Sequence, residues 1–526
     1  MDREDLLTNH AISPNDLACG HAPSRRLAAA IIVAASLTVF VVGMCGAVTT
    51  ADEVHHYGFA LSWARQGLLD RPTFNPIYES GEPPGYYYNG MPLWAGGLAS
   101  IWQVTGIHQW IAQLYQAAWF ALLLTMVYLL GRRMFDPRGA VVALLMALSM
   151  PLFTAFSVLL YVDVPTTALV MLCMVLICDR HYVWAGLAMG LAYLSKQNAW
   201  FLLPPLSLWI AWRETFGGEG PWPRRLGRMV AAGLMFGLPM FLIVLPDVLW
   251  RRAYLPRATN PVRLSSIAHR AGVIISKQRL ASSLTDPINI GTYFGGLVCL
   301  AIPVYFIRRA WKKHDVWIWL CLALYLAAMT VVFSINTDIR YTMPAAPLLA
   351  LIAARGLQPL WNRRYVLPTI GLIAALQFAG VVGYTMTYRQ LSDSQQAVFT
   401  YLREQTPKGT LVLYPGEVLA TEAERPPVWA NLLDPQTGRC NLPTFLHKYT
   451  PQQIADTLRG DGIRYAVVEQ AKVYDDARRR EQNGYPQSFV ERLKQAPGLE
   501  LVDGPWQGIL LFHVTDAAPP PNGQTP

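Results

Sequence analysis

An adjacent pair of acidic residues, Asp52 and Glu53, follows the first long apolar run of the chain. Ionisable side chains at the edge of a membrane are costly unless they are hydrated or paired, so they are candidates for a functional role. In a helix, Asp52 would share one side with His55, His56 and Phe59, at i, i+3, i+4 and i+7 spacing. A carboxylate there could act as a general base and take a proton from an attacking hydroxyl group. The alternative is a pair that only marks the end of a membrane span.

Further ionisable groups at the ends of later apolar runs are expected on the same side of the membrane as the acid pair. Asp163 precedes one run, Lys196 follows another, and Asp338 and Arg340 lie between two more. Each of them alone could be a helix cap or a solvated loop residue. Their repeated placement at one membrane surface is more typical of an enzyme or a transporter. In an enzyme, the basic groups could hold a phosphate leaving group and offset its developing charge.

The composition is that of a polytopic membrane protein. Of the 526 residues, 53% are hydrophobic and 15% are charged, whereas soluble globular proteins carry about 25% charged residues. The net charge of +9 fits basic residues in cytoplasmic loops. No basic stretch with interleaved aromatic residues predicts a nucleic-acid partner. The seven cysteines form neither a disulfide framework nor a metal-ligand motif.

Eleven membrane spans are predicted, because apolar runs recur that approach the roughly 20 residues needed to cross a bilayer. The first, residues 27–48, follows two arginines and exceeds the about 7–15 apolar residues of a signal peptide, so we expect it to remain uncleaved. The N-terminus is then cytoplasmic and the C-terminus external. The later spans are expected at 110–130, 138–163, 164–178, 184–194, 199–212, 229–250, 288–307, 317–335, 341–354 and 366–386.

One external loop departs from the charge rule that sets this orientation. Residues 251–287 carry seven basic side chains: Arg251, Arg252, Arg257, Arg263, Arg270, Lys277 and Arg279. External loops usually carry few basic residues, so we interpret this loop as a binding segment for an anion such as phosphate. Arginine can bind phosphate oxygens through two parallel hydrogen bonds. The alternatives are a solvated basic loop and one that binds anionic lipid headgroups.

After residue 388 the composition changes, and short strand-like runs alternate with helical patterns. Strands are expected at 410–414, 465–469, 500–502 and 509–514, and helices at 392–404, 451–459 and 486–495. This alternation favours a small α/β domain. We therefore divide the chain into a cytoplasmic tail (1–24), a transmembrane domain (25–388) with an external loop at 49–109, an external α/β domain (389–516) and a disordered tail (517–526).

Taken in order, these motifs resemble the GT-C superfamily, multi-spanning glycosyltransferases that use polyprenyl-phosphate sugars. The similarity to the protein O-mannosyltransferase and aminoarabinose-transferase group rests on Asp52-Glu53, Glu82-Pro83-Pro84, Asp163-Val164-Pro165 and Ser195-Lys196. A second similarity, to the eukaryotic glucosyltransferase that adds the last glucose to the dolichol-linked oligosaccharide, rests on DEVHH, PPGYYY, SKQNAW and DIRYTMP. The likeness covers roughly residues 27–388.

The resemblance implies an α-helical membrane enzyme of GT-C-like fold with an external active site. It makes Asp52 the catalytic base and Glu53 its partner, while Asp163 would position the acceptor or a cation. The donor would be a polyprenyl-phosphate-linked sugar, held by Lys196, Arg251, Arg257, Arg270, Lys277, Arg340, Glu82, Tyr86 and Tyr87. Glu82 departs from the aminoarabinose-transferase group, which usually has Lys before the double proline; this counts against a phosphate contact from this position and leaves the acceptor class open.

No motif indicates a defined cofactor. His55, His56 and His269 are candidates for a divalent-cation site together with carboxylates, although neighbours on one helix point in different directions. The expected partners are the lipid-linked donor, a glycan, lipid or protein acceptor, and membrane lipid. In a prokaryote the location would be the inner (plasma) membrane, with a periplasmic active site and C-terminal domain.

Two functions from other classes remain open. A transporter or flippase of a lipid-linked glycan would typically show internal repeats and ionisable groups near mid-membrane, but we find no convincing repeat and the charges cluster at one surface. A receptor that binds a cell-wall component through its C-terminal domain would leave Asp52, Asp163 and Lys196 unexplained. No phosphate-binding glycine motif follows a strand, which disfavours nucleotide-sugar chemistry.

Overall fold

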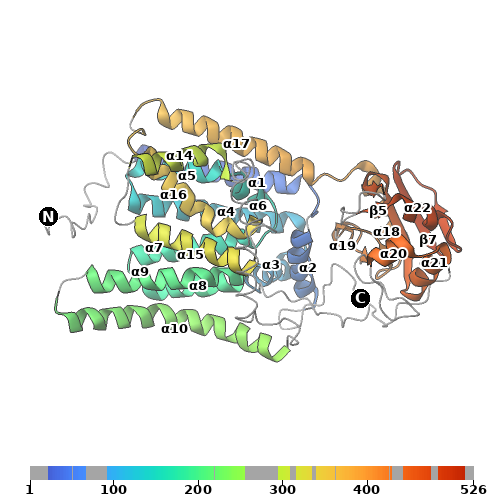
Figure 1. The fold of residues 1–526 in the computed structure, drawn as a ribbon, viewed down its shortest axis with the longest axis horizontal. Coiled ribbons are helices and arrows are strands. Elements are labelled where there is room, and N and C mark those ends of the chain that lie inside the picture. The colour runs from blue at the N-terminus through green and yellow to red at the C-terminus, as the bar shows by residue number, and fades with distance from the viewer. Residues whose placement is uncertain are drawn as a thin grey trace. The chain divides into compact units, whose positions relative to one another are not determined.

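The computed structural model (Figure 1) describes most of the chain. The described residues are 22–49, 51–66, 92–217, 220–254, 294–308, 315–333, 339–361, 363–416, 418–425, 427–428, 442–475 and 484–515. Contacts between residues divide the chain into two compact units. One comprises residues 1–43, 90–97 and 109–385, and the other 44–89, 98–108 and 386–526.

The first unit is built from helices. They are α1 (Ala22–Met44), α4 (Gln109–Met134), α5 (Pro137–Leu148), α6 (Pro151–Val158), α7 (Asp163–Cys178), α8 (Tyr182–Ser195), η2 (Gln197–Leu202), α9 (Leu203–Phe216), α10 (Trp222–Tyr254), α14 (Gly296–Ile307), α15 (Asp315–Phe333), η4 (Ile339–Ala345), α16 (Ala346–Leu357) and α17 (Val366–Tyr388). Within this bundle α7 packs between α4 and α8, and α8 also packs on α10. The helix α3 (Pro92–Thr105) begins in this unit and ends in the other.

Helices occupy all eleven regions where spans are expected. Among the described residues, four are long and apolar enough to cross a membrane: Ser24–Met44, Gln109–Met134, Trp222–Leu249 and Val366–Tyr388. A fifth arises if α5 and α6, bent by 69° at a short break, count as one span. Five shorter apolar helices are also described: Asp163–Cys178, Tyr182–Ser195, Gly296–Ile307, Asp315–Met329 and Thr342–Leu357. This confirms the predicted class, an α-helical membrane protein.

Proline residues and caps explain why several helices are short. Asp136 caps α5 by accepting a hydrogen bond from the Gly139 N–H, and Pro137 opens that helix. Pro151 opens α6 in the same way, which fits a residue whose missing N–H is not needed in the first turn. The basic loop was expected to begin at residue 251, but α10 continues to Tyr254. The two arginines at 251 and 252 are therefore helical.

The second unit contains an α/β fold with a five-stranded sheet. The strand order is β2 (Pro427–Val428), β1 (Leu411–Leu413), β3 (Ile463–Glu469), β7 (Ile509–Val514) and β6 (Leu499–Val502). β1 runs parallel to β2 and β3, whereas β7 runs antiparallel to β3 and β6. A second, two-stranded sheet pairs β4 (Val473–Tyr474) with β5 (Tyr485–Pro486). The helices are α2 (Ala51–Gln66), α18 (Asp393–Gln405), α19 (Val418–Glu422), α20 (Leu442–Lys448), α21 (Pro451–Gly460) and α22 (Gln487–Lys494), with η5 (Gln470–Lys472).

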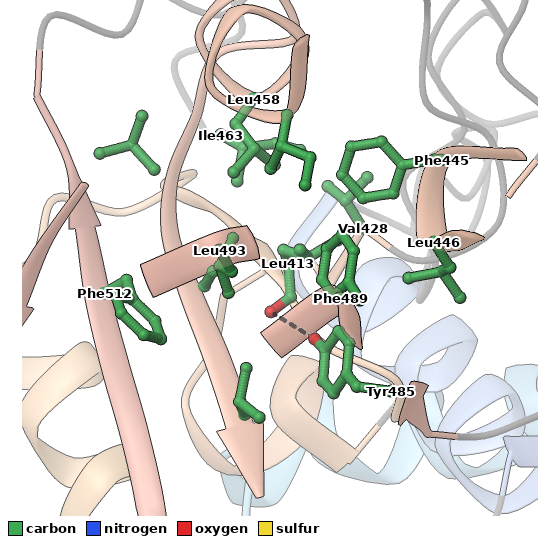
Figure 2. Close-up of a cluster of buried hydrophobic side chains, with 14 of the residues drawn as sticks. Leu413, Val428, Phe445, Leu446, Leu458, Ile463, Tyr485, Phe489, Leu493 and Phe512 are labelled. Atoms are coloured by element: carbon green, nitrogen blue, oxygen red, sulfur yellow. Dashed lines mark hydrogen bonds between the residues drawn. The ribbon is translucent and has the colours of Figure 1, made fainter. Parts of the chain in front are cut away.

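Helices cover both faces of the five-stranded sheet because its strands alternate their side chains between two apolar clusters. On one face Leu411 and Leu413 of β1 pack with α20, α21 and α22. Figure 2 shows this cluster, in which the Tyr485 hydroxyl donates a hydrogen bond to the Leu413 carbonyl over 3.4 Å. On the other face Val412 and Tyr414 pack with α18 and α19. The small α/β domain predicted after the last span is thus confirmed.

Candidate active site

Asp163 and Lys196 form a buried ion pair in the first unit. The Nζ of Lys196 lies 2.6 Å from Oδ1 of Asp163, and the two residues are only 6% and 1% exposed. Asp163 is the first residue of α7, and Lys196 follows α8 in an extended conformation that ends the helix. Taking two charges out of water costs several kcal/mol per ion unless further hydrogen bonds support them. The structure thus brings together two residues that the sequence named separately.

Gln116 of α4 supports the backbone that leads into Asp163. Its buried side-chain amide donates hydrogen bonds to the carbonyls of Leu159 and Tyr161, at 2.9 and 3.1 Å. The indole N–H of Trp94 donates to Gln116 Oε1 over 3.0 Å and fixes the orientation of the amide. The sequence analysis missed this residue. The available signal was a glutamine inside an otherwise apolar run.

The hydroxyl group of Ser195 ties the ends of α7 and α8 together. Its Oγ lies 2.9 Å from Oγ1 of Thr166 and 3.2 Å from the carbonyl oxygen of Val162. Ser195 directly precedes Lys196, and Val162 directly precedes Asp163. The polar contacts next to the ion pair therefore set the positions of both charged residues.

One carboxylate oxygen of Asp163 is not used by the ion pair. Oδ2 is buried and has no hydrogen-bond partner among the residues that the structure describes. A buried acceptor without a partner costs about 1–3 kcal/mol, so a hydroxyl group or a cation from a substrate would be favoured there. Within the described ranges, His, Cys, Asp and Glu residues do not gather into a group of three that could hold a metal ion.

The segment that carries Arg340 belongs to the same part of the bundle. Arg340 lies in η4, which packs against α7 and α6. Its backbone is described, but its side chain lies outside the described residues. η4 thus packs against the helix that Asp163 begins, and the role of Arg340 as a phosphate ligand stays a prediction.

The acid pair lies in the first turn of α2 in the second unit, so the spacing considered for a helix applies. Glu53 is fully buried and pairs with the fully buried Arg389, with 3.3 Å between Oε1 and Nη1. Its other oxygen, Oε2, accepts a hydrogen bond from the Thr49 N–H over 3.3 Å. The side chain of Asp52 lies outside the described residues. Sequence analysis did not single out Arg389, which reads as one more basic residue at the end of a span.

The residues that follow the acid pair on α2 are largely shielded from water. His56 is 6% exposed, and the ring centroid of His55 lies 6.4 Å from that of Phe59. Tyr57 packs edge-on against Trp102 with 5.2 Å between ring centroids. Burial raises the pKa of Tyr57 to about 12, so this phenol stays neutral and does not supply a base near neutral pH.

The chain is similar to known proteins in sequence over one segment and in fold over most of its length. A family model described as dolichyl-phosphate-mannose-protein mannosyltransferase matches residues 91–250. Comparison with curated protein sequences finds no match. Among solved structures, the chain is similar to ArnT from Cupriavidus metallidurans bound to undecaprenyl phosphate. The identity is 15% and the TM-score 0.57, over 93% of this chain and 99% of that chain.

Two archaeal structures are similar to a comparable degree. One is the apo form of the Archaeoglobus fulgidus oligosaccharyltransferase, with 14% identity and a TM-score of 0.57, over 84% of this chain and 69% of that chain. The other is AglB from the same organism in complex with an inhibitory peptide and a dolichol-phosphate, with 15% identity, a TM-score of 0.56 and the same coverage. The chain shares the fold of these three solved structures. This confirms the resemblance that the ordered motifs indicated.

Several predicted site residues of this GT-C-like chain lie outside the described residues. They are Glu82, Tyr86, Tyr87, Arg257, His269, Arg270 and Lys277. The side chain of Arg251 is also outside the described residues, although its backbone belongs to α10. The predicted roles of these residues as ligands of the donor, or of His269 as a metal ligand, stay predictions.

Proposed function

We propose that this protein is a membrane glycosyltransferase that transfers a sugar from a polyprenyl-phosphate donor to a glycan, lipid or protein acceptor. The observation that carries the proposal is the buried Asp163–Lys196 pair, whose Oδ2 has no partner among the described residues. A purely structural pair is better satisfied when all its lone pairs are bonded, whereas a substrate site must leave some free. The molecules bound in two solved structures of this fold, undecaprenyl phosphate and dolichol-phosphate, support the donor class.

In the proposed reaction the acceptor oxygen attacks the anomeric carbon of the sugar. The bond between that carbon and the phosphate oxygen breaks, and its electron pair stays on the polyprenyl phosphate. The proton of the acceptor hydroxyl passes to Asp52, which acts as the general base. Lys196 and Arg340 offset the negative charge that develops on the phosphate. Asp163 holds Lys196 and positions the acceptor or a cation through its second oxygen.

Other predicted ligands complete the proposed site. Arg251, Arg257, Arg270 and Lys277 would bind the donor phosphate from the basic segment, and Glu82, Tyr86 and Tyr87 would contact the donor from the first external loop. The active site and the C-terminal domain are assigned to the external side, which is the periplasm if the membrane is a prokaryotic inner membrane. This orientation rests on the distribution of Lys and Arg among the loops.

Labelled donors and an isosteric change at Asp52 test the proposal. Membranes with and without the protein are incubated with polyprenyl-phosphate sugars that carry a radiolabel, and the labelled products are separated from the donor. We expect one labelled acceptor to depend on the protein, and Asp52→Asn to reduce its formation at least ~100-fold at unchanged protein level. Asp393→Asn, an exposed change in the first turn of α18, is the matched control.

Two results would contradict this function. Undiminished transfer by Asp52→Asn would show that the base is another residue. Movement of the labelled lipid across the membrane without any transfer would favour the flippase instead.

A further inference from the structure

Ala47 and Val48, which follow α1, form four hydrogen bonds with residues of the C-terminal domain. The Ala47 N–H donates to the carbonyl of Arg389, and the Nε of Arg389 donates to the carbonyl of Ala47, each over 3.0 Å. The Val48 N–H donates to Oε1 of Glu422, and the Thr421 hydroxyl donates to the carbonyl of Val48, each over 3.3 Å. The backbone N–H and C=O groups of two successive residues, Ala47 and Val48, are thus all bonded shortly before α2 begins.

Arg389 links this segment to the acid pair. While its Nε binds the Ala47 carbonyl, its Nη1 pairs with Glu53 on the first turn of α2. An arginine can do this because its donors lie in a rigid planar fork, whereas a lysine offers one compact charge. Space around the side chain is tight as well. A Cβ on Gly46 would lie 2.5 Å from the Cβ of Arg389, so a larger residue at this position would force Arg389 to shift.

A wholly buried ion pair is a poor source of stability. Replacing such a pair by well-packed apolar residues is often neutral or stabilising, since the cost of desolvation offsets the attraction. Glu53 and Arg389 are both fully buried, so a gain in stability does not by itself account for this pair. Their geometry supplies one, because the pair fixes the helical turn that presents the adjacent Asp52.

We propose that Arg389 is a positioning residue for the general base: it holds Glu53 and thereby the first turn of α2, from which Asp52 acts. This inference rests on the proposed function of Asp52. It also gives the C-terminal domain a role, because Arg389 is the first residue of that domain (389–516) and α19 of the domain packs on α2. Glu53 then acts through its neighbour and does not itself take the proton.

The first test separates turnover from stability in the full-length protein. Arg389→Met and Arg389→Lys are purified in detergent, and kcat, KM for the labelled donor and Tm are measured for each. Misplacing a catalytic group by about 1 Å can cost on the order of 10²-fold in rate, so we expect Arg389→Met to lose about that much kcat per folded molecule at unchanged donor KM. Arg389→Lys should recover part of the loss.

A matched control comes from a second buried ion pair. Arg355 pairs with Asp315 in the first unit over 3.2 Å, and both side chains are at most 5% exposed. Arg355→Met should lower Tm as much as Arg389→Met does but leave kcat per folded molecule unchanged. Equal losses of kcat in the two variants would show that the effect is general destabilisation, and would overturn the proposal.

A second variant tests the geometry without removing any charge. Gly46→Ala places a methyl group against Arg389 and should reproduce the kcat loss. Gly380→Ala is the matched control, because a Cβ there meets nothing within 4 Å. This arm remains informative if Arg389→Met fails to fold. Wild-type kcat in Gly46→Ala would contradict the proposal.

A double-mutant cycle completes the test. If Arg389 acts through Glu53, the variant with Glu53→Met and Arg389→Met should lose no more kcat than Arg389→Met alone, since residues in one network are not additive. Losses that multiply would show that the two residues act independently. Full activity in Asp52→Asn would contradict the proposed role of Asp52 as the base. The double-mutant cycle would still measure the coupling between Glu53 and Arg389, so the two failures can be told apart.

Discussion

Lys196 and Asp163 are 33 positions apart in the sequence, yet their charged atoms lie 2.6 Å from each other. The reason is the hairpin formed by α7 and α8, which pack side by side. The two helices have 16 and 14 residues, so the chain returns to the level at which it started. The first residue of α7 and the residue after α8 must therefore meet at one end of the hairpin.

The first prediction concerns the stability of this pair. Lys196→Met leaves the Asp163 carboxylate buried without its partner, so the free energy of unfolding should fall by roughly 3–5 kcal/mol. The double variant Asp163→Leu with Lys196→Met removes both charges and should regain most of that stability, because an apolar pair of similar volume is often neutral. Neither variant should transfer sugar. Denaturation in detergent and the labelled-donor assay measure the two effects.

Retained activity in the stable double variant would contradict the proposed role of both residues. An unchanged stability of Lys196→Met would instead show that Asp163 accepts a proton or another partner when the lysine is absent.

The second prediction compares two glutamines on α4. Gln116→Leu leaves the carbonyls of Leu159 and Tyr161 without their donor and should cost about 1–3 kcal/mol. It should also reduce transfer, since the backbone before Asp163 is released. Gln113 is equally buried, but neither polar atom of its side chain has a hydrogen-bond partner among the described residues. Gln113→Leu should therefore be neutral or stabilising, which makes it the matched control in the same thermal-unfolding and transfer measurements.

Equal destabilisation by Gln113→Leu would mean that the amide of Gln113 has a partner elsewhere in the chain. No loss of transfer in Gln116→Leu would show that Asp163 keeps its position without this support.

Strands and helices with a clear pattern could be predicted from the sequence. The strand expected at 509–514 is β7 (Ile509–Val514), and the helix expected at 451–459 is α21 (Pro451–Gly460) within one residue. Both have alternating or helical apolar patterns that fit their burial. β2 (Pro427–Val428) and α19 (Val418–Glu422) were missed because two and five residues are too short to show a period.

The site was only partly predictable for a different reason. Asp163 and Lys196 were named because charged residues beside apolar runs stand out, but their direct contact depends on the similar lengths of α7 and α8. Gln116 and Arg389 were missed because their partners are backbone carbonyls or a residue far along the chain. Periodicity reports which face of an element is buried, and it carries no information about such pairings between distant segments.

The last prediction is a pH dependence of stability in the second unit. Burial raises the pKa of the Glu422 carboxyl group above its ordinary value of 4.5, against the lowering effects of the Val48 N–H, Arg403 and Arg389, and the nearby Glu53 adds a smaller rise. The folded state therefore binds a proton at Glu422 more tightly than the unfolded state does. Its contribution to stability is fully present below pH 4.5 and is lost as the pH rises through the raised pKa.

Glu422→Gln isolates this effect, because the amide is neutral at every pH and its oxygen can still accept the Val48 N–H. We expect the variant to have a higher Tm than the wild type at neutral pH, with the difference vanishing as the pH falls toward 4.5. Glu404→Gln, an exposed change on α18, is the control and should show no such trend. A Tm of Glu422→Gln that lies below the wild type at neutral pH would show that the charged carboxylate, paired with nearby arginines, is the more stable form.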